Sequence, residues 1–366
     1  MKVICLQENL KNNLSILERI SSKNSTMPIL NHTLLKTEDG FLKTFATDLE
    51  IGVEIQIPCK IEIKGEVVLP IKLLLNFINN LPITKITIKS DNGKVILEGE
   101  GLKTNIPTLN KDDFPIIPKI KPIHLIIINP NILKTSLNQV LNSTAISPSI
   151  PEISGILFNF QQDVLKIVST DSFRLSEKII YQKDNYKTKD ECKFILPQKT
   201  ANELIRSINQ IEDIEIELDQ NQILFKLKNI NIISRIITGE YPNYEQIIPK
   251  KTKTSISLDK NDFTAKIKLA SLFSSKINDV KFIINPDDGI LEIQSSSQDK
   301  GEFNSIIKTE INGEGFEVVF NYKYILDGLN NIYDDEIVFE MNGPASPSII
   351  KSKTSNYNYV VMPIKT

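Results

Sequence analysis

Alternating apolar and polar residues predict short β-strands along most of the chain, and one arrangement of strands returns three times. A polar turn followed by an alternating strand is present as DGFLKTFATD at 39–48, QDVLKIVSTD at 162–171 and, less closely, DDGILEIQSS at 287–296. One leucine keeps its place in all three copies: Leu42, Leu165 and Leu291. The copies are spaced by roughly 120–130 residues, which is the size of a domain.

Two further patterns repeat with the first. Strand, polar turn and strand, which is typical of a hairpin, follow one another at 83–101, 211–229 and 334–353. A β-rich run leads into a segment with helical apolar spacing at 65–81, 192–208 and 316–332. The residue between strand and helix is Pro70, Pro197 or Asn321. Proline favours the first turn of a helix and asparagine favours its cap, so these residues predict helix starts.

Each copy also opens with a predicted helix, at 7–22, 129–145 and 259–276. The first two copies close with related linkers, FPIIPK at 114–119 and YPNYEQIIPK at 241–250, which contain prolines and no periodicity. We therefore predict three tandem α+β domains, over 1–119, 120–248 and 249–366. Each is expected to have two helices and antiparallel sheets.

Composition narrows the class of protein. The chain has 366 residues, of which 40% are hydrophobic, enough to build several cores. No apolar run approaches the roughly 18 residues that span a bilayer, and the N-terminus lacks the apolar core of a signal peptide. The three cysteines, Cys5, Cys59 and Cys192, are far apart, as is typical of reduced thiols. We expect a cytoplasmic protein without disulfides.

Positive charge is concentrated in the predicted helices. A lysine follows two residues after each helix-start residue, as Lys72, Lys199 and Lys323. The helical segments 8–24, 71–80, 131–146, 199–209, 260–277 and 321–332 hold twelve basic and five acidic residues, a net charge of +7. The whole chain carries −2, so the remainder carries −9.

Two interpretations of this charge remain open. The lysines can be the solvated face of helices in a lysine-rich protein. If the helices share one face, that face would instead contact phosphates without reading base sequence. No aromatic residues interleave the lysines, which favours duplex over single-stranded nucleic acid.

Residue patterns for catalysis or metal binding are missing. His32 and His124 have no cysteine or acidic partner at ligand spacing, and no GxxxxGK[ST], GxGxxG or GxSxG motif occurs. The pairs Thr47-Asp48 and Thr170-Asp171 lie at matched strand ends, where aspartate commonly stabilises a turn. We expect neither metal nor cofactor, and an unrecognised enzyme is the weakest alternative.

The chain resembles the bacterial sliding clamp family, the beta subunit of DNA polymerase III. The resemblance covers the full length and is carried by ATDLEI (46–51), TDSFRL (170–175), YPNYEQIIPK (241–250), NYKYILDGLN (321–330) and the terminal YVVMPIKT. It implies a head-to-tail homodimeric ring in which helices line a hole around duplex DNA. It also implies a non-catalytic processivity factor that tethers the replicative polymerase, with ring opening left to a clamp loader.

The resemblance assigns roles to individual residues. The DNA-facing positions of the family are Lys23, Lys72 and Lys199. We add Lys134 and Arg206 from the basic predicted helices 131–146 and 199–209, and Lys323 from the repeat. The dimer contact would set Leu272 and Phe273 of one chain against the strand with Thr104 and Ile106 of the next. Thr104 stands where the family often has an aromatic residue.

The resemblance further implies a hydrophobic pocket for partner peptides with leucine and phenylalanine anchors, which would belong to polymerases and repair proteins. Its residues here are Ile153, Thr170, Phe173, Arg174, Leu175, Pro242, Ile247, Val360, Val361, Met362, Pro363 and Ile364. Gln246, Ser172 and Phe173 depart from the Arg, Gly and His that are common in the family. A scaffold of three docking domains that binds only proteins is the alternative function.

Overall fold

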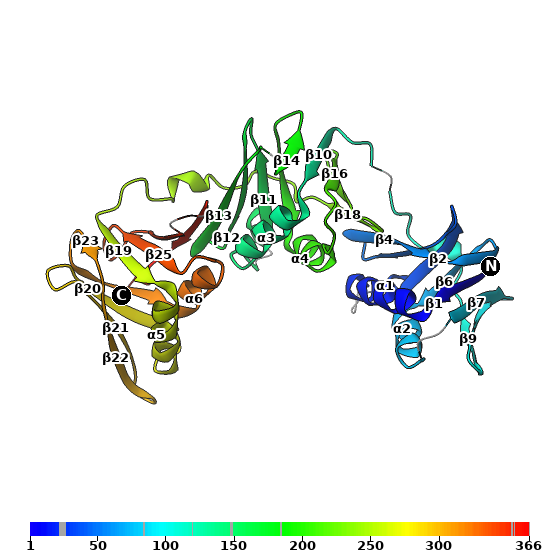
Figure 1. Ribbon diagram of the computed structural model, residues 1–366, viewed down its shortest axis with the longest axis horizontal. Coiled ribbons are helices and arrows are strands. Elements are labelled where there is room, and N and C mark those ends of the chain that lie inside the picture. Colours follow the sequence, from blue (N-terminus) through cyan, green and yellow to red (C-terminus); the bar gives the residue numbers. More distant parts are fainter. Residues whose placement is uncertain are drawn as a thin grey trace. The chain divides into compact units, whose positions relative to one another are not determined.

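The computed structural model describes the chain except at residues 22–26, 83–84, 119, 147–148, 184, 353, 355 and 366. The described residues form two compact units, and Figure 1 labels many of their elements. The first unit contains residues 1–130, 186–189 and 206–236, and the second contains 131–185, 190–205 and 237–366. Both units include parts of the predicted middle domain, so the division into three domains stays a prediction.

The first unit has a nine-stranded antiparallel sheet in the order β14-β10-β16-β17-β18-β4-β3-β2-β6. Its strands are β2 (His32–Glu38), β3 (Phe41–Thr47), β4 (Ile51–Pro58), β6 (Glu66–Pro70), β10 (His124–Ile128), β14 (Tyr186–Thr188), β16 (Ile214–Leu218), β17 (Gln222–Lys226) and β18 (Ile230–Arg235). Because β18 pairs with β4, strands from both sides of the first linker form one continuous sheet.

A second, five-stranded sheet in this unit has the order β5-β1-β7-β8-β9. It contains β1 (Lys2–Leu6), β5 (Lys60–Ile63), β7 (Lys85–Asp91), β8 (Lys94–Gly99) and β9 (Leu102–Pro107). Helices α1 (Gln7–Ile20) and α2 (Ile71–Asn79) pack against each other. The 3-10 turns η1 (Pro28–Asn31) and η2 (Lys111–Asp113) complete the unit.

The second unit also combines a nine-stranded sheet with a smaller one. The larger has the order β15-β11-β12-β13-β27-β26-β25-β19-β23 and the smaller β22-β21-β20-β24. The larger contains β11 (Gly155–Phe160), β12 (Val164–Thr170), β13 (Arg174–Tyr181), β15 (Cys192–Pro197), β19 (Thr254–Asp259), β23 (Ile311–Asn312), β25 (Glu336–Met341), β26 (Ser348–Ser352) and β27 (Tyr357–Val361). The smaller contains β20 (Asp279–Asn285), β21 (Ile290–Ser297), β22 (Gly301–Lys308) and β24 (Phe316–Asn321).

The remaining helices are α3 (Pro130–Leu141), α4 (Gln198–Ser207), α5 (Lys260–Leu272) and α6 (Tyr322–Asn330), with 3-10 turns η3 (Pro151–Ser154) and η4 (Tyr244–Gln246). Six helices in the described residues therefore match the six that periodicity predicts. In α1, Leu10, Leu14 and Leu17 are fully buried on one face, the spacing expected of an amphipathic helix. Burying each such side chain stabilises the fold by about 1.5–3 kcal/mol.

The predicted hairpins are confirmed as β7–β8, β16–β17 and β25–β26. The predicted helix starts are confirmed with one difference. Asn321 caps α6, because its side-chain Oδ1 accepts a hydrogen bond of 3.0 Å from the Lys323 amide. Pro70 and Pro197 instead end the preceding strands, one residue before α2 and α4. Proline has no backbone N–H, but no hydrogen bond is lost at the end of these strands. The fixed φ of proline also suits the turn into the helix.

Candidate functional site

Most of the basic side chains predicted to face DNA lie exposed on helices. Lys72 on α2, Lys199 and Arg206 on α4 and Lys323 on α6 are exposed, and Lys134 on α3 is half-buried. Lys23 lies outside the described residues. Within their observed bounds the helices hold ten basic and five acidic residues, a net charge of +5. The helices of the structure therefore carry a net positive charge, as the predicted helical segments do.

Helix packing places some of these cations on neighbouring helices. The contact of α1 with α2 sets exposed Lys11 and Lys72 on adjacent elements, and the contact of α5 with α6 does the same for Lys268 and Lys323. Lys266 on α5 differs, because it forms an ion pair of 3.0 Å with Asp262 on its own helix. The charge of Lys266 is thereby largely neutralised.

The residues predicted to bind a peptide gather around the junction of β13 and β27, all within the second unit. We call this group the terminal-strand site. A tight turn at residues 170–174 forms its framework. The Thr170 hydroxyl donates to the Arg174 carbonyl at 2.7 Å, and the Asp171 carboxylate accepts from the Arg174 amide at 3.0 Å. The Thr-Asp pair is thus structural, as its position at a strand end predicts.

The floor of the site is apolar and buried. Ile153, Leu175 and Val360 belong to one core cluster and are each less than 5% exposed. Tyr241 and Tyr244 of the second linker are buried members of the same cluster. This cluster holds the floor in a fixed position, so only the rim is available to a partner.

The rim combines exposed and half-buried side chains. Phe173 is 59% exposed and Ile247 is 41% exposed, and Pro242 and Gln246 are also exposed. Arg174, Met362 and Ile364 are half-buried, whereas Thr170 is buried. The Met362 amide donates to the Phe173 carbonyl at 2.8 Å, which fixes the last residues of the chain along the turn.

Two predicted members differ from the expectation. Val361 is fully buried and packs in the core cluster of the C-terminal part of the chain, and Pro363 is also buried. The cause is strand alternation: Val360 and Val361 face opposite sides of β27, so only one of them can face the terminal-strand site. The side chain of Val361 is therefore a core residue.

Arg174 is the centre of a charged and aromatic cluster. Its guanidinium pairs with Asp171 at 2.9 Å and with Asp327 of α6, and lies 4.5 Å from the centre of the Tyr324 ring. Burial alone would lower the pKa of Arg174, but Tyr359 and the two carboxylates together raise it. Arg174 therefore stays cationic and joins β13 to α6.

Sequence reasoning missed Tyr324 and Asp327, although both lie in the motif NYKYILDGLN. The Phe173 ring stacks on Tyr324 with 6.4 Å between centroids, so α6 supplies one wall of the rim. Gly328 allows α6 to lie close to Tyr359 of β27, because a Cβ atom at residue 328 would lie 2.4 Å from the Tyr359 ring. The repeat predicts the helix that carries Gly328, but it does not predict that Tyr359 lies next to this glycine.

The residues predicted to form the dimer contact lie on or beside two edge strands, β9 and β22. Among the described residues, β9 pairs only with β8 and β22 only with β21. Thr104 on β9 is half-buried, whereas Ile106 is 2% exposed and belongs to the core of the first unit. At this edge Ile106 offers its backbone and not its side chain. Edge strands present unpaired N–H and C=O groups that another strand can pair with.

The other predicted partner surface is apolar. Leu272 at the end of α5 is 62% exposed, and the Phe273 ring stacks on Phe303 of β22 with 5.9 Å between centroids. Ile306, also on β22, is 51% exposed. Sequence reasoning missed Phe303 and Ile306. Phe303 lies on the side of β22 that packs against the core and Phe273, whereas Ile306, three residues on, faces the opposite side of the strand. Phe303 alone therefore extends the apolar surface of Leu272 and Phe273.

Family models for the N-terminal, central and C-terminal domains of the DNA polymerase III beta subunit match residues 1–118, 127–243 and 245–365. The chain belongs to the DNA polymerase III beta subunit family. The six helices and antiparallel sheets described above are the elements of its three clamp domains.

Relatives span this beta-subunit chain almost completely. A beta sliding clamp of Staphylococcus aureus is 28% identical over 358 residues, which cover 94% of each chain. A beta sliding clamp of Synechococcus elongatus is 26% identical and covers 100% of this chain and 99% of its own. The crystal structure of a DNA polymerase sliding clamp from Bacillus subtilis, 26% identical, has a TM-score of 0.93 and covers 100% of this chain and 99% of its own.

No group of three or more His, Cys, Asp or Glu side chains suited to a metal ion is present in the part of the chain that the structure describes. A search of the same residues finds no helix of the length and apolarity that crossing a membrane requires. Burial raises the pKa of the Cys5 thiol to about 12 and that of Cys192 to about 11. Both thiols are therefore poor nucleophiles near neutral pH.

Proposed function

We propose that the chain is a DNA sliding clamp, a homodimeric ring that encloses duplex DNA and keeps a DNA polymerase on its template. Family membership over all three domain ranges carries this proposal, together with relatives named beta sliding clamp that match nearly the full chain. In this role the chain catalyses no reaction and works in the cytoplasm beside the nucleoid. Processivity comes from enclosing the template.

The exposed helix lysines would face the DNA. Lys72, Lys199 and Lys323 occupy matched positions at the starts of α2, α4 and α6. Single lysine–phosphate contacts in water are weak and exchange quickly, and salt screens them over about 8–10 Å. A surface of such contacts attracts a duplex without holding it at one place, which sliding requires.

The exposed edges β9 and β22 would close the ring. Among the described residues each edge has a free row of backbone groups, and the β22 edge adds the apolar surface of Leu272, Phe273 and Phe303. Pairing β9 of one chain with β22 of another would bury that surface and satisfy both edges. The joint would be heterologous, and two such joints close a two-chain ring.

The terminal-strand site would bind short peptides of polymerases, the clamp loader and repair proteins. Its buried floor and its exposed Phe173 and Ile247 provide apolar contacts, and half-buried Met362 adapts to different side chains. Each apolar anchor that becomes buried supplies about 1.5–3 kcal/mol before the costs of ordering the peptide. Arg174 would orient the peptide, since its charge is fixed by two carboxylates.

Retention on DNA tests the ring directly. The clamp is loaded on nicked circular DNA with its clamp loader and ATP, isolated by gel filtration, and then exposed to a restriction enzyme. We expect the chain to stay on the circle and to leave when the circle is linearised. Retention on linear DNA with free ends would contradict enclosure.

A charge-reversal variant separates DNA contact from protein docking. Changing Lys72, Lys199 and Lys323 together to Glu should impair loading or sliding, because it reverses charges next to the duplex. The matched control changes three exposed lysines that lie outside helices, Lys94, Lys193 and Lys251, to Glu and alters net charge equally. If both variants loaded like the unmodified chain, a scaffold that binds only proteins would be the better interpretation.

Point substitutions at the rim test the peptide site. Phe173→Ala and Met362→Ala should reduce stimulation of the polymerase about tenfold or more, because each removes apolar contact worth about 1.4 kcal/mol or more. Retention on circular DNA should be unchanged. Full stimulation by both variants would show that the polymerase docks elsewhere.

A further inference from the structure

The turn of the terminal-strand site has a counterpart in the first unit. Residues 47–51 form the same turn as residues 170–174, with hydrogen bonds in matching places. The Thr47 hydroxyl donates to the Ile51 carbonyl at 2.9 Å, and the Asp48 carboxylate accepts from the Ile51 amide at 2.8 Å. The third residue of each turn has a left-handed backbone, with φ of 78° at Leu49 and 76° at Ser172.

The strand beside each turn also corresponds. β18 pairs with β4 so that Ser234 faces Ile51, as Val361 of β27 faces Arg174 of β13. The next amide closes the turn in both places: Arg235 donates to the Glu50 carbonyl at 2.9 Å, as Met362 donates to the Phe173 carbonyl at 2.8 Å. The backbone that builds the terminal-strand site is therefore present twice in the chain.

A hollow accompanies this second copy. Its volume is about 400 Å³, and it is lined by the turn, by the end of β18 and by the first linker. We call it the first-linker groove; its lining residues are Thr47, Leu49, Glu50, Ile51, Gly52, Pro115, Ile116, Ile117, Pro118, Gln222, Ile233, Ser234 and Arg235. All of them belong to the first unit.

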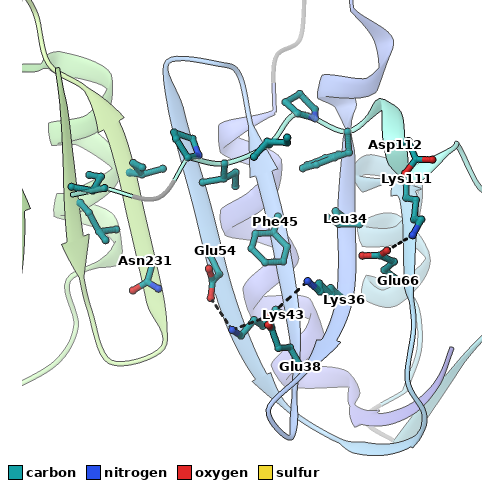
Figure 2. A pocket seen from close by; sticks show the side chains of 18 of the residues that line it. Leu34, Lys36, Glu38, Lys43, Phe45, Glu54, Glu66, Lys111, Asp112 and Asn231 are labelled. Carbon is teal, nitrogen blue, oxygen red and sulfur yellow. Dashed lines mark hydrogen bonds and ion pairs between the residues drawn. The ribbon is translucent and has the colours of Figure 1, made fainter. Parts of the chain in front are cut away.

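The linker crosses the sheet between this groove and a larger hollow of about 800 Å³, which shares residues 115–118 and Ile233 with it. Figure 2 shows Leu34 and Phe45 of the larger hollow beneath the linker, with charged side chains around them. Two lysines there are paired: Lys43 lies 3.2 Å from Glu38, and Lys111 lies 2.5 Å from Glu66. The larger hollow therefore extends the groove with apolar surface and compensated charge.

Gly52 lets the first linker pack closely on the sheet at the bottom of the groove. A Cβ atom there would lie 3.0 Å from Ile233 and 3.5 Å from Ile117 of the linker. Ile117 thus packs directly over the sheet, in the place where Ile248 of the second linker packs against its own core. A partner side chain must lie beside Ile117, against Leu49 and Ile116, which are 46% and 92% exposed.

The rims of the two sites differ in charge. Glu50 stands where the terminal-strand site has Phe173, and Arg235 stands where it has Met362. Both side chains are exposed, and neither forms an ion pair or side-chain hydrogen bond with any described residue. One unpaired charge of each sign therefore stands on the rim.

We propose that the first-linker groove is a second docking site, which takes a short extended peptide with an aliphatic anchor between an acidic and a basic residue. The aliphatic side chain would pack on Leu49 and Ile116, the acidic residue would pair with Arg235, and the basic residue with Glu50. Opposite charges on both sides give specificity for this peptide over the leucine–phenylalanine peptides of the terminal-strand site. This second site depends on the proposed peptide function of the terminal-strand site only through the backbone that the two sites share.

Hydrogen exchange on the full chain tests this proposal. The probe is a fluorescein-labelled peptide containing aspartate, leucine and lysine in succession between Gly-Ser flanks. An excess of unlabelled leucine–phenylalanine peptide occupies the terminal-strand site throughout, and protection at 170–175 and 360–364 reports that site separately. We expect the probe to protect residues 47–52, 115–118 and 233–235. Protection confined to the terminal-strand site, or no protection at all, overturns the proposal.

Charge variants make the test quantitative by fluorescence anisotropy. Arg235→Glu should weaken binding of the probe about tenfold, because it replaces an attraction by a repulsion at the rim. The matched control, Lys187→Glu, changes an exposed charge elsewhere in the first unit and should leave binding unchanged. Equal weakening by both variants would indicate unspecific charge attraction and contradict the site. Binding seen only in Ile117→Ala would show that the linker fills the groove, which also overturns the proposal.

Discussion

The turn at 47–51 in the first unit and the turn at 170–174 in the second share a backbone but are completed by different interactions. In the second unit, Arg174 joins the turn to α6 through Asp327 and the Tyr324 ring. In the first, the matching residue is Ile51, which is 2% exposed, and the linker residue Ile117 packs over Gly52. The repeat thus fixes the hydrogen bonds of the turn, while side chains decide whether charge or apolar packing completes it.

The largest effect should come from the floor of the terminal-strand site. Leu175→Ala removes a side chain that is 2% exposed and leaves a cavity, so the free energy of unfolding should fall by about 2–5 kcal/mol. Urea unfolding followed by circular dichroism measures the change. Leu73→Ala on α2, where the leucine is 51% exposed, is the control and should cost much less. A loss below about 1 kcal/mol for Leu175→Ala would mean that this floor relaxes unlike a packed core.

The ionic link of Arg174 should be the next largest difference between the two turns. A double-mutant cycle with Arg174→Ala and Asp327→Ala should give a coupling energy of about 1–3 kcal/mol, because the Arg174 side chain is only 12% exposed. The exposed pair Lys111 and Glu66 of the first unit is the control, and its coupling should stay below about 1 kcal/mol. Equal coupling in the two cycles would show that partial burial does not strengthen the Arg174 link.

The threonines test the shared backbone itself. Thr47→Val and Thr170→Val each remove a hydroxyl that donates to one carbonyl and accepts from one amide. Each should lower the free energy of unfolding by about 1–2 kcal/mol, and the two losses should agree within about 0.5 kcal/mol. Urea titration of both variants measures this. A large loss at only one site would show that the turns are similar in geometry but not in energy.

The smallest effect concerns the left-handed residues. Ser172→Gly should raise the melting temperature slightly, because glycine adopts a positive φ at no steric cost, with a net gain of about 0.5 kcal/mol. Ser172→Ala keeps the unfavourable φ and should give no gain. Leu49→Gly should gain less than Ser172→Gly, since it also removes a side chain that is 46% exposed and partly packed. Scanning calorimetry on the variants compares them; a larger gain for Ser172→Ala than for Ser172→Gly would contradict the role of φ.

Sequence reasoning located the local elements of the fold and missed most contacts between them. Period-two and helical spacing place β7–β8 and α6 correctly, because both patterns depend on residues close in the chain. The pairing of Arg174 with Asp327 joins residues 153 positions apart, and no local pattern specifies it. In β9, alternation puts Thr104 and Ile106 on one face of the strand but does not say that this face is the core side.

The same difference between local patterns and contacts across the fold applies to individual site residues. The resemblance named the residues around the terminal-strand site, but it could not separate the floor from the rim, or Val361 from Val360. That separation depends on which side of β27 meets which core, and the clusters in the structure decide it. The sequence does not predict the first-linker groove, although both linkers and both turns are recognisable as repeats. A hollow depends on how a linker packs on a sheet, which the repeat does not determine.

The position of β27 has a consequence for synthesis of the protein. This strand follows β13 and β26 in the chain, yet it lies between them in the interior of the larger sheet. Until β27 has been synthesised, β13 and β26 both present open edges, and this sheet exists as two separate halves. Chains whose translation stops before β27 would keep these edges and would be prone to aggregate. Completion of this sheet is therefore expected only after β27 has emerged from the ribosome.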